Sequence, residues 1–498
     1  MLGRRPPGTK VTTSVGRLSP ANLNVLQGWG LAARTSDVSS MPIRTGPRGR
    51  AADDVQNEEE ESMTTFDHEV IVVGAGPTGL MLAAELVLAG VDVGVVERRP
   101  DQHVDSSRAG GLYPRTLEVL DQRGVADRFV SAGTTIGSAG FALVVLDVTD
   151  LPTRFPFVLA LWQRDFEPIL ADWVAELGVT VRRSDEVTDV VASPDHVEVA
   201  LADGTTLRAQ YVVGCDGGRS VVRRAAGIEA VGADPTTSWL IAEVDLDGDP
   251  EYGMRYDDAG HHGLSPLGPD GPVRVLITER ELHRGDQPDL DELRRALVEV
   301  YGTDHGLRDA RWISRFTDMT RQAVDYRRGR VLLAGDAAHT HPPHGGQGLN
   351  TGVQDAVNLG WKLAQVVHGT SGEELLDTYR DERHPVAARV LRNTLAQVAL
   401  GRPDVRSKAA HQTVTELLAT DEARVRTASM VTALDLRYGI DGGGSHPLVG
   451  HRIPDLDLTT VDGPTRIAQL LRDARPLLLS FGPGTVSDPE VPDRVSRI

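Results

Sequence analysis

Residues 331–363, VLLAGDAAHTHPPHGGQGLNTGVQDAVNLGWKL, contain the clearest pattern in this chain. An apolar run typical of a buried strand leads into an acidic turn at Gly335 and Asp336, and then into a loop rich in proline, glycine and histidine. Beyond the loop, apolar or small residues recur at helical spacing, at positions 353, 356, 357, 360, 363 and 364. The segment therefore predicts a strand, a loop and an amphipathic helix, in that order.

The start of that helix combines flexible backbone with free amide groups. Gly345, Gly346 and Gly348 allow the backbone to pass close to a flat ligand. The N–H groups at a helix N-terminus, together with the helix dipole, favour negative charge. A ligand that is anionic along one edge would fit such a loop, although an ordinary glycine-rich turn explains this stretch equally well.

Composition limits the classes of protein to consider. The 498 residues are enough for two to four domains at about 100–200 residues each. A formal net charge of −19 argues against nucleic acid and anionic membranes as partners. Cys215 is the single cysteine, which excludes an internal disulfide framework and fits the cytoplasm. No apolar run approaches the roughly 18 residues that a membrane span requires.

Residues 1–62 differ in composition from the rest of the chain. They are rich in Gly, Pro, Ser and Arg and end in an acidic run, Glu58 to Glu61. This composition predicts a disordered N-terminal extension. We expect translation to begin at Met63, directly before the first strand, and the intact mass of the native protein tests that expectation.

A dinucleotide-binding unit is predicted at residues 66–99, FDHEVIVVGAGPTGLMLAAELVLAGVDVGVVERR. A buried strand precedes Gly74, Gly76 and Gly79, an apolar helix comes next, and a second strand ends at Glu97. The first glycine permits the tight turn, the second admits a pyrophosphate, and the third lets the helix pack on the strand. A carboxylate at the end of the second strand can accept hydrogen bonds from a ribose, so the unit predicts bound NAD or FAD.

Two polar residues downstream have open roles. Arg108 lies just after the nucleotide unit, where it could contact a flavin or a reductant, or simply face solvent. Gln163 begins a helix whose apolar positions recur at three- and four-residue spacing, and its amide could reach a ribityl chain or only cap that helix. Residues 185–214 predict three strands, with a hairpin turn at Asp203 and Gly204.

The last of these strands runs into CDGGRSVVR, residues 215–223, a second acidic glycine turn that opens a helix. With GAGPTG and GDAAHTHPPHGGQGLNTGVQDAVNLGWKL, it resembles the group A flavoprotein monooxygenases, the FAD-dependent aromatic hydroxylases related to para-hydroxybenzoate hydroxylase. Within them the chain is most similar to bacterial enzymes that hydroxylate polyketides, rifamycins and tetracyclines. The resemblance spans about residues 66–480.

The resemblance implies an α/β fold in which a Rossmann-like FAD-binding domain is interleaved with an α+β substrate domain. Its FAD-binding parts would be residues 63–233 and 312–440, with 141–162 contributing to the substrate side, and its substrate domain residues 234–311. Residues 441–498 would begin a thioredoxin-like unit without a CxxC pair, and the chain ends too soon to complete it. In this unit we expect a helix from Thr465 to Arg472. Earlier, helices should run from Glu373 to Arg383 and, after Pro385, to Arg424.

The resemblance also implies cofactor-binding residues, carried over motif by motif. The ADP part of FAD would be held by the first glycine turn and the acidic strand end, Asp216 would serve both FAD and NAD(P)H, and Asp336 the ribityl chain. The full set is Gly74, Gly76, Pro77, Thr78, Gly79, Glu97, Arg98, Arg108, Gln163, Asp216, Asp336, Pro343, Gly346, Gly348, Leu349 and Asn350.

The implied chemistry is oxygen insertion. NADH or NADPH reduces FAD, O2 adds to give a flavin C4a-hydroperoxide, and one oxygen atom passes to an electron-rich aromatic carbon. Baeyer–Villiger oxygenation, an oxidase or dehydrogenase using the same unit, and an inactive FAD-binding homologue are the alternatives. The expected partner is a small aromatic or polyketide substrate, with the protein as a monomer or homodimer.

Residues 234–311 alternate in the manner of antiparallel strands. Trp239, Met254, Tyr256, Leu264 and Pro342 are candidates for the wall of the substrate pocket, although such residues are more often plain core.

Three histidines in the glycine loop form HxHxxH, at His339, His341 and His344. Because no carboxylates or thiols cluster with them in the sequence, we expect no metal site. His344 stands where relatives mostly have Thr, Ser or an aromatic residue. We expect Arg108, Pro343 and His344 to contribute to catalysis, with His344 as a proton shuttle.

Overall fold

The computed structural model describes residues 66–104, 109–267, 271–285, 287–439, 446–479 and 496–497. The chain divides into one unit that ends at Met63 and a second that comprises Thr64–Ile498. The expected disorder of residues 1–62 and the role of Arg108 fall outside the described residues.

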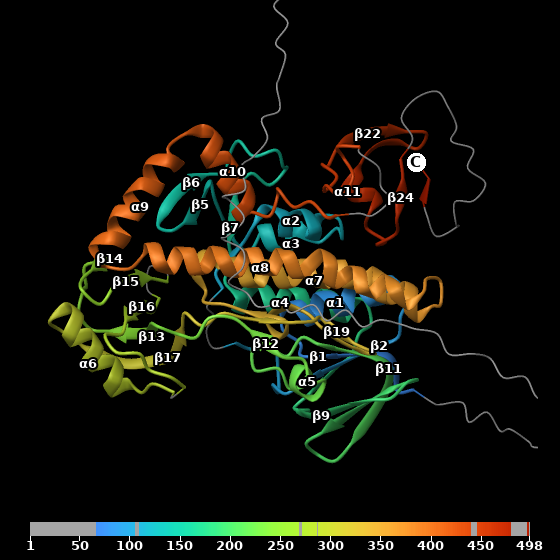
Figure 1. Cartoon of the computed structure of the whole chain (residues 1–498), viewed down its shortest axis with the longest axis horizontal. Coiled ribbons are helices and arrows are strands. Elements are labelled where there is room, and N and C mark those ends of the chain that lie inside the picture. Colours follow the sequence, from blue (N-terminus) through green and yellow to red (C-terminus); the bar gives the residue numbers. More distant parts are fainter. Residues whose placement is uncertain are drawn as a thin grey trace, which may run out of the picture. The chain divides into compact units, whose positions relative to one another are not determined.

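The central sheet places three separated segments of the chain side by side. Its parallel strands are β8 (Val181–Arg183), β2 (Val93–Glu97), β1 (His68–Val73), β11 (Thr206–Gly214) and β20 (Val331–Leu333), in that order, and β19 (Arg327–Arg328) closes one edge. Strands β9 (Val187–Ala192) and β10 (Val197–Leu201) extend β11 as an antiparallel ribbon, as their spacing predicts (Figure 1). Val72 pairs with Val213, and Val213 with Leu332. The carboxyl ends of β1, β11 and β20 therefore meet at one edge.

Two helices from the predicted motifs pack against each other beside this sheet. Helix α1 (Pro77–Leu88) follows β1, and α7 (Gln347–Val367) follows the glycine loop. A Cβ atom on Gly352 would lie 2.2 Å from Thr78 Oγ1, so the helices approach closely only because Gly352 has no side chain. Buried Val, Leu and Ala side chains of the strands and of both helices form the largest core.

Helix α8 (Asp377–Leu400) runs along α7 and corrects one expectation. Sequence reasoning predicted a break at Pro385, yet the helix continues through it. A proline inside a helix removes one backbone hydrogen bond, and the packing of α8 against α7 offsets that loss. The 3₁₀ turn η4 (Glu373–Leu376) precedes α8, and α9 (Val405–Leu418) and α10 (Asp421–Val431) follow it.

A second sheet has five antiparallel strands, as the alternation predicted for 234–311. The order is β14 (Gly253–Tyr256), β15 (His261–Pro266), β16 (Val273–Thr278), β13 (Ser238–Leu246) and β17 (Leu307–Thr317). Helix α6 (Leu290–Tyr301) starts with a capping box between Asp289 and Glu292 and covers one face (Figure 1). The other face presents Trp239, Ile241 and Phe316, which pack with Val398 of α8.

Shorter elements link the two sheets. Strands β3 (Gly111–Leu112), β7 (Val158–Ala160) and β4 (Thr134–Ile136) form one small sheet, and β5 (Ser138–Phe141) pairs with β6 (Val144–Asp147) in a hairpin. Strands β12 (Ala230–Val231), β18 (Arg321–Ala323) and β21 (His339–Thr340) form another. The accompanying helices are α2 (Pro114–Asp121), α3 (Ala126–Val130), α4 (Gln163–Glu176) and α5 (Val221–Ala225).

The C-terminal segment contains a hairpin and one helical turn. Strands β22 (Asp457–Thr460) and β23 (Gly463–Arg466) precede α11 (Ile467–Leu470), and β24 (Leu477–Leu478) pairs in parallel with β25 (Ser496–Arg497). The helix predicted from Thr465 to Arg472 is wrong at both ends, because Thr465 belongs to β23 and the helix ends at Leu470. Within the described residues, no helix has the length and apolar character needed to cross a membrane.

Candidate functional site

Three glycine-bearing turns meet where β1, β11 and β20 end. The Cys215 N–H donates to the Val73 carbonyl at 2.8 Å, and the Ala334 N–H donates to the Gly214 carbonyl at 3.0 Å. A Cβ atom on Gly74, whose φ is +103°, would lie 2.6 Å from the Cys215 carbonyl oxygen. Ligands of open α/β sheets bind in the crevice outside the carboxyl ends of the strands, which is where these turns lie.

The glycines of the first turn differ in what surrounds them. Gly79 faces Gly74, whose carbonyl oxygen would lie 1.9 Å from a Cβ atom on Gly79. Gly76 has no heavy atom within 4 Å of the Cβ position, and its backbone is extended, at φ −78°. Gly79 is thus required by packing, whereas the space at Gly76 is open and suits the close approach of a pyrophosphate.

Pro77 occupies the first turn of α1, where its missing N–H costs no hydrogen bond. Thr78, which is also expected to bind the cofactor, packs its side chain inside the protein. Its Oγ1 lies 2.5 Å from the Cβ position of Gly335 and 2.2 Å from that of Gly352, so the side chain fills the contact between α1, α7 and the third turn.

Glu97 turns back toward the first glycine turn. Its Oε2 accepts from the Ala75 N–H at 2.7 Å, and its Oε1 accepts from the Arg99 N–H at 2.9 Å. The predicted Arg98 is exposed, whereas its neighbour Arg99 forms ion pairs with Glu97 and Glu167. Arg98 and Arg99 follow the end of β2 at Glu97, and Arg99 turns back toward the carboxylate.

Gln163 is held by a residue that sequence reasoning missed. Buried Glu167 of α4 accepts from Gln163 Nε2 at 2.5 Å, from Gln102 Nε2 at 2.6 Å and from Arg99 Nη2 at 3.0 Å. Gln102 Nε2 also donates to the Ala75 carbonyl at 2.9 Å. Glu167 therefore connects the first glycine turn to the residue expected at the ribityl chain, and its charge within an apolar helix face was the available signal.

The second turn presents an acceptor without a partner. Asp216 Oδ2 accepts from the Val221 N–H at 2.6 Å, whereas the buried Oδ1 has no hydrogen-bond partner among the described residues. Beside it, Gly217 has φ +79° and open space at its Cβ position. An orphaned carboxylate oxygen next to open space fits a ligand that donates hydrogen bonds, such as the hydroxyls of a flavin side chain or a ribose.

The third turn is anchored from below by a buried ion pair. Asp355 of α7 accepts from the Gly335 N–H at 3.2 Å, from His339 Nε2 at 2.6 Å and from Arg383 Nε at 2.6 Å. Burial raises the pKa of Asp355, but Arg383 and His339 outweigh that effect and lower it below its usual value. Asp336 remains exposed on the turn, free to meet a ribityl chain. The sequence signal for this anchor is Asp355 itself, an acidic residue among the buried positions of α7.

The loop after the third turn needs its glycines. Gly345 and Gly346 have φ of +73° and +59°, and Gly346 leads directly into α7. Asn350 fixes this helix start, because its Oδ1 accepts from the Tyr113 N–H at 2.8 Å and its Nδ2 donates to the Gly111 carbonyl at 3.0 Å. Pro343, Gly348 and Leu349 are partly exposed there, as a surface for a flat ring requires.

The three loop histidines have separate surroundings. His339 bonds Asp355, and His341 Nδ1 lies 2.7 Å from the carbonyl oxygen of Pro342. His344 lies against the second sheet, with its ring centroid 5.1 Å from that of Trp239 and 5.9 Å from that of His261. Burial, reinforced by His261, lowers the pKa of His344 to about 4, so its ring is neutral near pH 7.

The expected pocket-wall residues separate into three groups. Buried Trp239 stacks on Phe316 at 5.2 Å and meets the glycine loop through His344, and buried Pro342 belongs to that loop. Met254 and Tyr256 lie on edge strand β14 and are exposed. Leu264 faces the opposite side of the sheet, in the core beneath α6, so it is core rather than pocket wall. Period-two alternation placed its side chain on that face.

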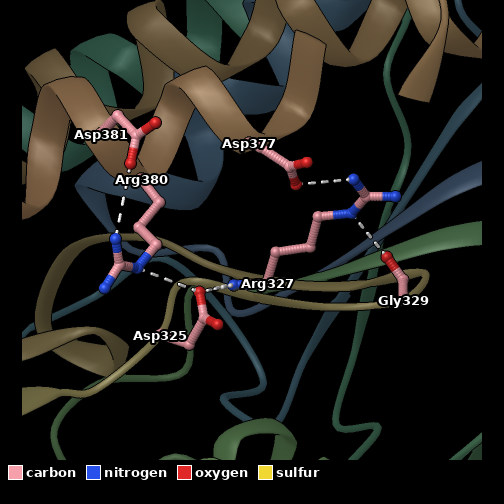
Figure 2. Close-up of a pocket in the computed structure, with 6 residues that line it drawn as sticks. All are labelled: Asp325, Arg327, Gly329, Asp377, Arg380 and Asp381. Atoms are coloured by element: carbon pink, nitrogen blue, oxygen red, sulfur yellow. Dashed lines mark hydrogen bonds and ion pairs between the residues drawn. The ribbon is translucent and has the colours of Figure 1, made fainter. Parts of the chain in front are cut away.

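A separate hollow of about 460 Å³ lies on the surface between β19 and the start of α8. Figure 2 shows Arg327 paired with Asp377, and Arg380 paired with Asp325 and with its chain neighbour Asp381. Arg327 Nη1 donates to Asp377 at 3.0 Å and its Nε to the Gly329 carbonyl at 2.8 Å. The polar groups that line this hollow are paired with each other, so the hollow offers fewer free hydrogen-bonding groups to a ligand than the three turns do.

Two family models match the chain. The first, described as the FAD binding domain, matches residues 67–394, and the second, described as the C-terminal part of aromatic-ring hydroxylases, matches residues 446–496.

Similar proteins agree with that match. A 12-dehydrotetracycline 5-monooxygenase/anhydrotetracycline 6-monooxygenase of Streptomyces rimosus is 43% identical over 83% of this chain and 86% of its own length. A rifampicin monooxygenase of Streptomyces venezuelae is 42% identical over 86% of this chain and 90% of its own. The solved structure of the anhydrotetracycline hydroxylase OxyS from Streptomyces rimosus superposes with a TM-score of 0.82 at 42% identity, covering 86% of this chain and 89% of that one.

Proposed function

Because this chain belongs to the FAD-dependent aromatic-ring hydroxylases and is a FAD-dependent monooxygenase, we propose that it inserts one oxygen atom into a phenolic, polyketide-type substrate. NADH or NADPH is the proposed electron donor, and O2 the co-substrate. The observation that carries the proposal is the meeting of three glycine turns at the ends of β1, β11 and β20, where Gly76 and Gly217 leave space and Asp216 Oδ1 lacks a partner among the described residues.

The residues around these turns suit the separate parts of FAD. Gly74, Gly76 and Gly79 would hold the pyrophosphate at the start of α1, and Glu97 the adenosine ribose. Asp216, Asp336 and Gln163 would bind the hydroxyls of the ribityl chain. Pro343, Gly346, Gly348, Leu349 and Asn350 would line the flavin ring, which would meet the N-terminus of α7.

FAD held at these turns would supply the redox chemistry, with electrons from NAD(P)H and one oxygen atom from O2. The chain's own contribution would be to orient the substrate, to exclude water and to move one proton. Trp239, Phe316 and the glycine loop would exclude water from the space where the substrate meets the flavin, which also strengthens electrostatic interactions there. His344, neutral near pH 7, would carry the proton between substrate and solvent.

The domain organisation is part of the proposal. Residues 63–233 and 312–440 would form a Rossmann-like FAD-binding domain, and 234–311 the substrate domain between them. Residues 441–498 would belong to a thioredoxin-like unit.

The direct test is to purify the protein, look for flavin absorbance, and follow NADPH loss and O2 uptake with and without anhydrotetracycline and rifampicin. The proposal expects substrate-stimulated NADPH oxidation and a product about 16 mass units heavier, the mass of one inserted oxygen. NMR of the product separates ring hydroxylation from Baeyer–Villiger insertion beside a ketone. A flavin-loaded protein that never consumes NADPH would favour an inactive homologue.

His344→Ala tests the proton-transfer role. Coupled product formation should fall, and its pH dependence should change, because the variant lacks the imidazole proposed to carry the proton. Unchanged coupling and an unchanged pH profile would remove His344 from the mechanism.

A further inference from the structure

Two buried polar atoms lack partners where the glycine loop meets the second sheet. They are Nε1 of Trp239, on β13, and Nδ1 of His344, in the loop, and neither has a hydrogen-bond partner among the described residues. Their rings are 5.1 Å apart between centroids and inclined at 64°. The two atoms thus belong to neighbouring rings that come from different elements.

Unpaired buried groups are uncommon in folded proteins, since burial without a partner costs stability comparable to losing a hydrogen bond. The neighbouring rings do not replace the missing hydrogen bonds. Phe316 stacks on one face of Trp239 and also packs beside the His344 ring, as His261 does. A partner supplied by a bound molecule explains both orphans at once.

The chemistry of the two atoms defines that partner. An indole N–H only donates a hydrogen bond, and the Nδ1 of a neutral imidazole accepts one when its proton is on Nε2. His344 is neutral near pH 7, because burial lowers its pKa to about 4. A hydroxyl group accepts and donates through one oxygen, so it satisfies both atoms, whereas an ether or a ketone can satisfy only Trp239.

We propose that Trp239 and His344 together hold one hydroxyl oxygen of an aromatic substrate, with Trp239 donating to it and His344 accepting from it. This inference rests on the proposed monooxygenase function and names the substrate group that the site reads. A ring hydroxyl also enriches its ortho and para carbons in electrons. The group that fixes the orientation of the ring is therefore the group that activates it.

The surrounding side chains suit a flat ring with such a hydroxyl. Trp239 and Phe316 provide a stacked aromatic wall, and Pro343, beside His344, places this anchor next to the proposed flavin surface. Met254 and Tyr256 share the sheet face of His261, since Met254 pairs with Gly263 and Tyr256 with His261, and both are exposed. This face thus leads from exposed side chains to the buried anchor.

The test compares 1-naphthol with 1-methoxynaphthalene, which differ by methylation of the one hydroxyl. Binding to the FAD-loaded protein is measured by the change in flavin absorbance, for the wild type, Trp239→Phe and His344→Phe. Trp312→Phe is the matched control. It also removes an indole from the same apolar cluster, but Trp312 Nε1 is not one of the two unpaired atoms.

The wild type should bind 1-naphthol about tenfold more tightly than the ether, the worth of a hydrogen bond to an otherwise unpaired group. Trp239→Phe and His344→Phe should each reduce that preference severalfold, and Trp312→Phe should keep it. No preference in the wild type, including failure to bind either compound, overturns the proposal. A preference that survives in both variants also overturns it.

A second readout separates this proposal from the function beneath it. If the wild type takes up FAD and forms an oxygenated product while its preference for the hydroxyl is absent, the anchor is wrong and the monooxygenase assignment stands. If the protein takes up no FAD, the proposed function fails and the anchor fails with it.

Discussion

Single glycines in the first turn have opposite roles, and the roles can be tested separately. Gly79→Ala should lower the free energy of unfolding by about 2 kcal/mol or more, because the new Cβ atom would lie 1.9 Å from the Gly74 carbonyl oxygen. Gly76→Ala is the matched control, since nothing lies within 4 Å of its Cβ position. Urea unfolding of both apoproteins measures the difference, and equal stabilities would contradict the assigned packing.

The buried imidazole of His344 predicts a pH dependence of stability. The pKa of His344 is lowered from 6.5 to about 4 in the folded chain, by burial and by His261 and His341, while Asp318 opposes the shift. The unfolded chain therefore binds the extra proton first. The stability that the neutral His344 ring contributes to the fold is fully present above pH 6.5 and is lost as the pH falls through about 4.

Between about pH 7 and about pH 5, the wild type should lose roughly 2 kcal/mol more stability than His344→Gln. Urea unfolding of the two apoproteins at both pH values measures this difference. His261, whose pKa burial also lowers, is present in both proteins, so the removed His344 ring is the difference between them. Parallel losses in the two proteins would show that the His344 ring titrates normally.

Among the elements, the contact between α1 and α7 depends on one small residue. Gly352→Ala should cost about 2–3 kcal/mol, because the new Cβ atom would meet Thr78 Oγ1 at 2.2 Å. Thr78→Ala in the same chain should return at least about 1 kcal/mol of that cost. Unfolding free energies of the wild type, the two single variants and the double variant give the coupling. Additive effects of the two substitutions would contradict a close contact between α1 and α7 at Gly352 and Thr78.

Breaking the buried ion pair between α7 and α8 should lower the free energy of unfolding far more than breaking an exposed ion pair. Asp355→Asn leaves Arg383 buried without its carboxylate and should cost about 3–5 kcal/mol. The control is Asp245→Asn, which breaks the exposed pair with Arg311 at a cost of up to about 1 kcal/mol. Urea unfolding compares them, and similar costs would contradict the role of Asp355 as the anchor of the third turn.

At the scale of the whole molecule, local patterns were predictable and contacts between distant segments were not. The first glycine turn and the strands of the second sheet follow from residue spacing within short windows, so strands such as β14 and β16 are present within residues 234–311 as expected. The continuous α8 was missed because packing against α7, which overrides Pro385, is invisible to local reasoning.

The candidate site divides in the same way. Gly76 and Asp216 could be found from their motifs, because glycine turns at strand ends have a recognisable sequence pattern. The contact of His344 with Trp239 could not, since it depends on how the loop after β20 meets a separate sheet. Nor could the ion pair of Arg99 with Glu97, which depends on how the chain turns back after β2.

The central claim is that FAD binds at the three glycine turns. Titration of the apoprotein with FAD, followed by flavin fluorescence, tests it most directly when the wild type is compared with Gly76→Ala. The account predicts one FAD per wild-type chain and binding at least about tenfold weaker in the variant, because the added methyl group occupies the space left for the pyrophosphate. Equal affinity in the two proteins, or no flavin binding by the wild type, would contradict it.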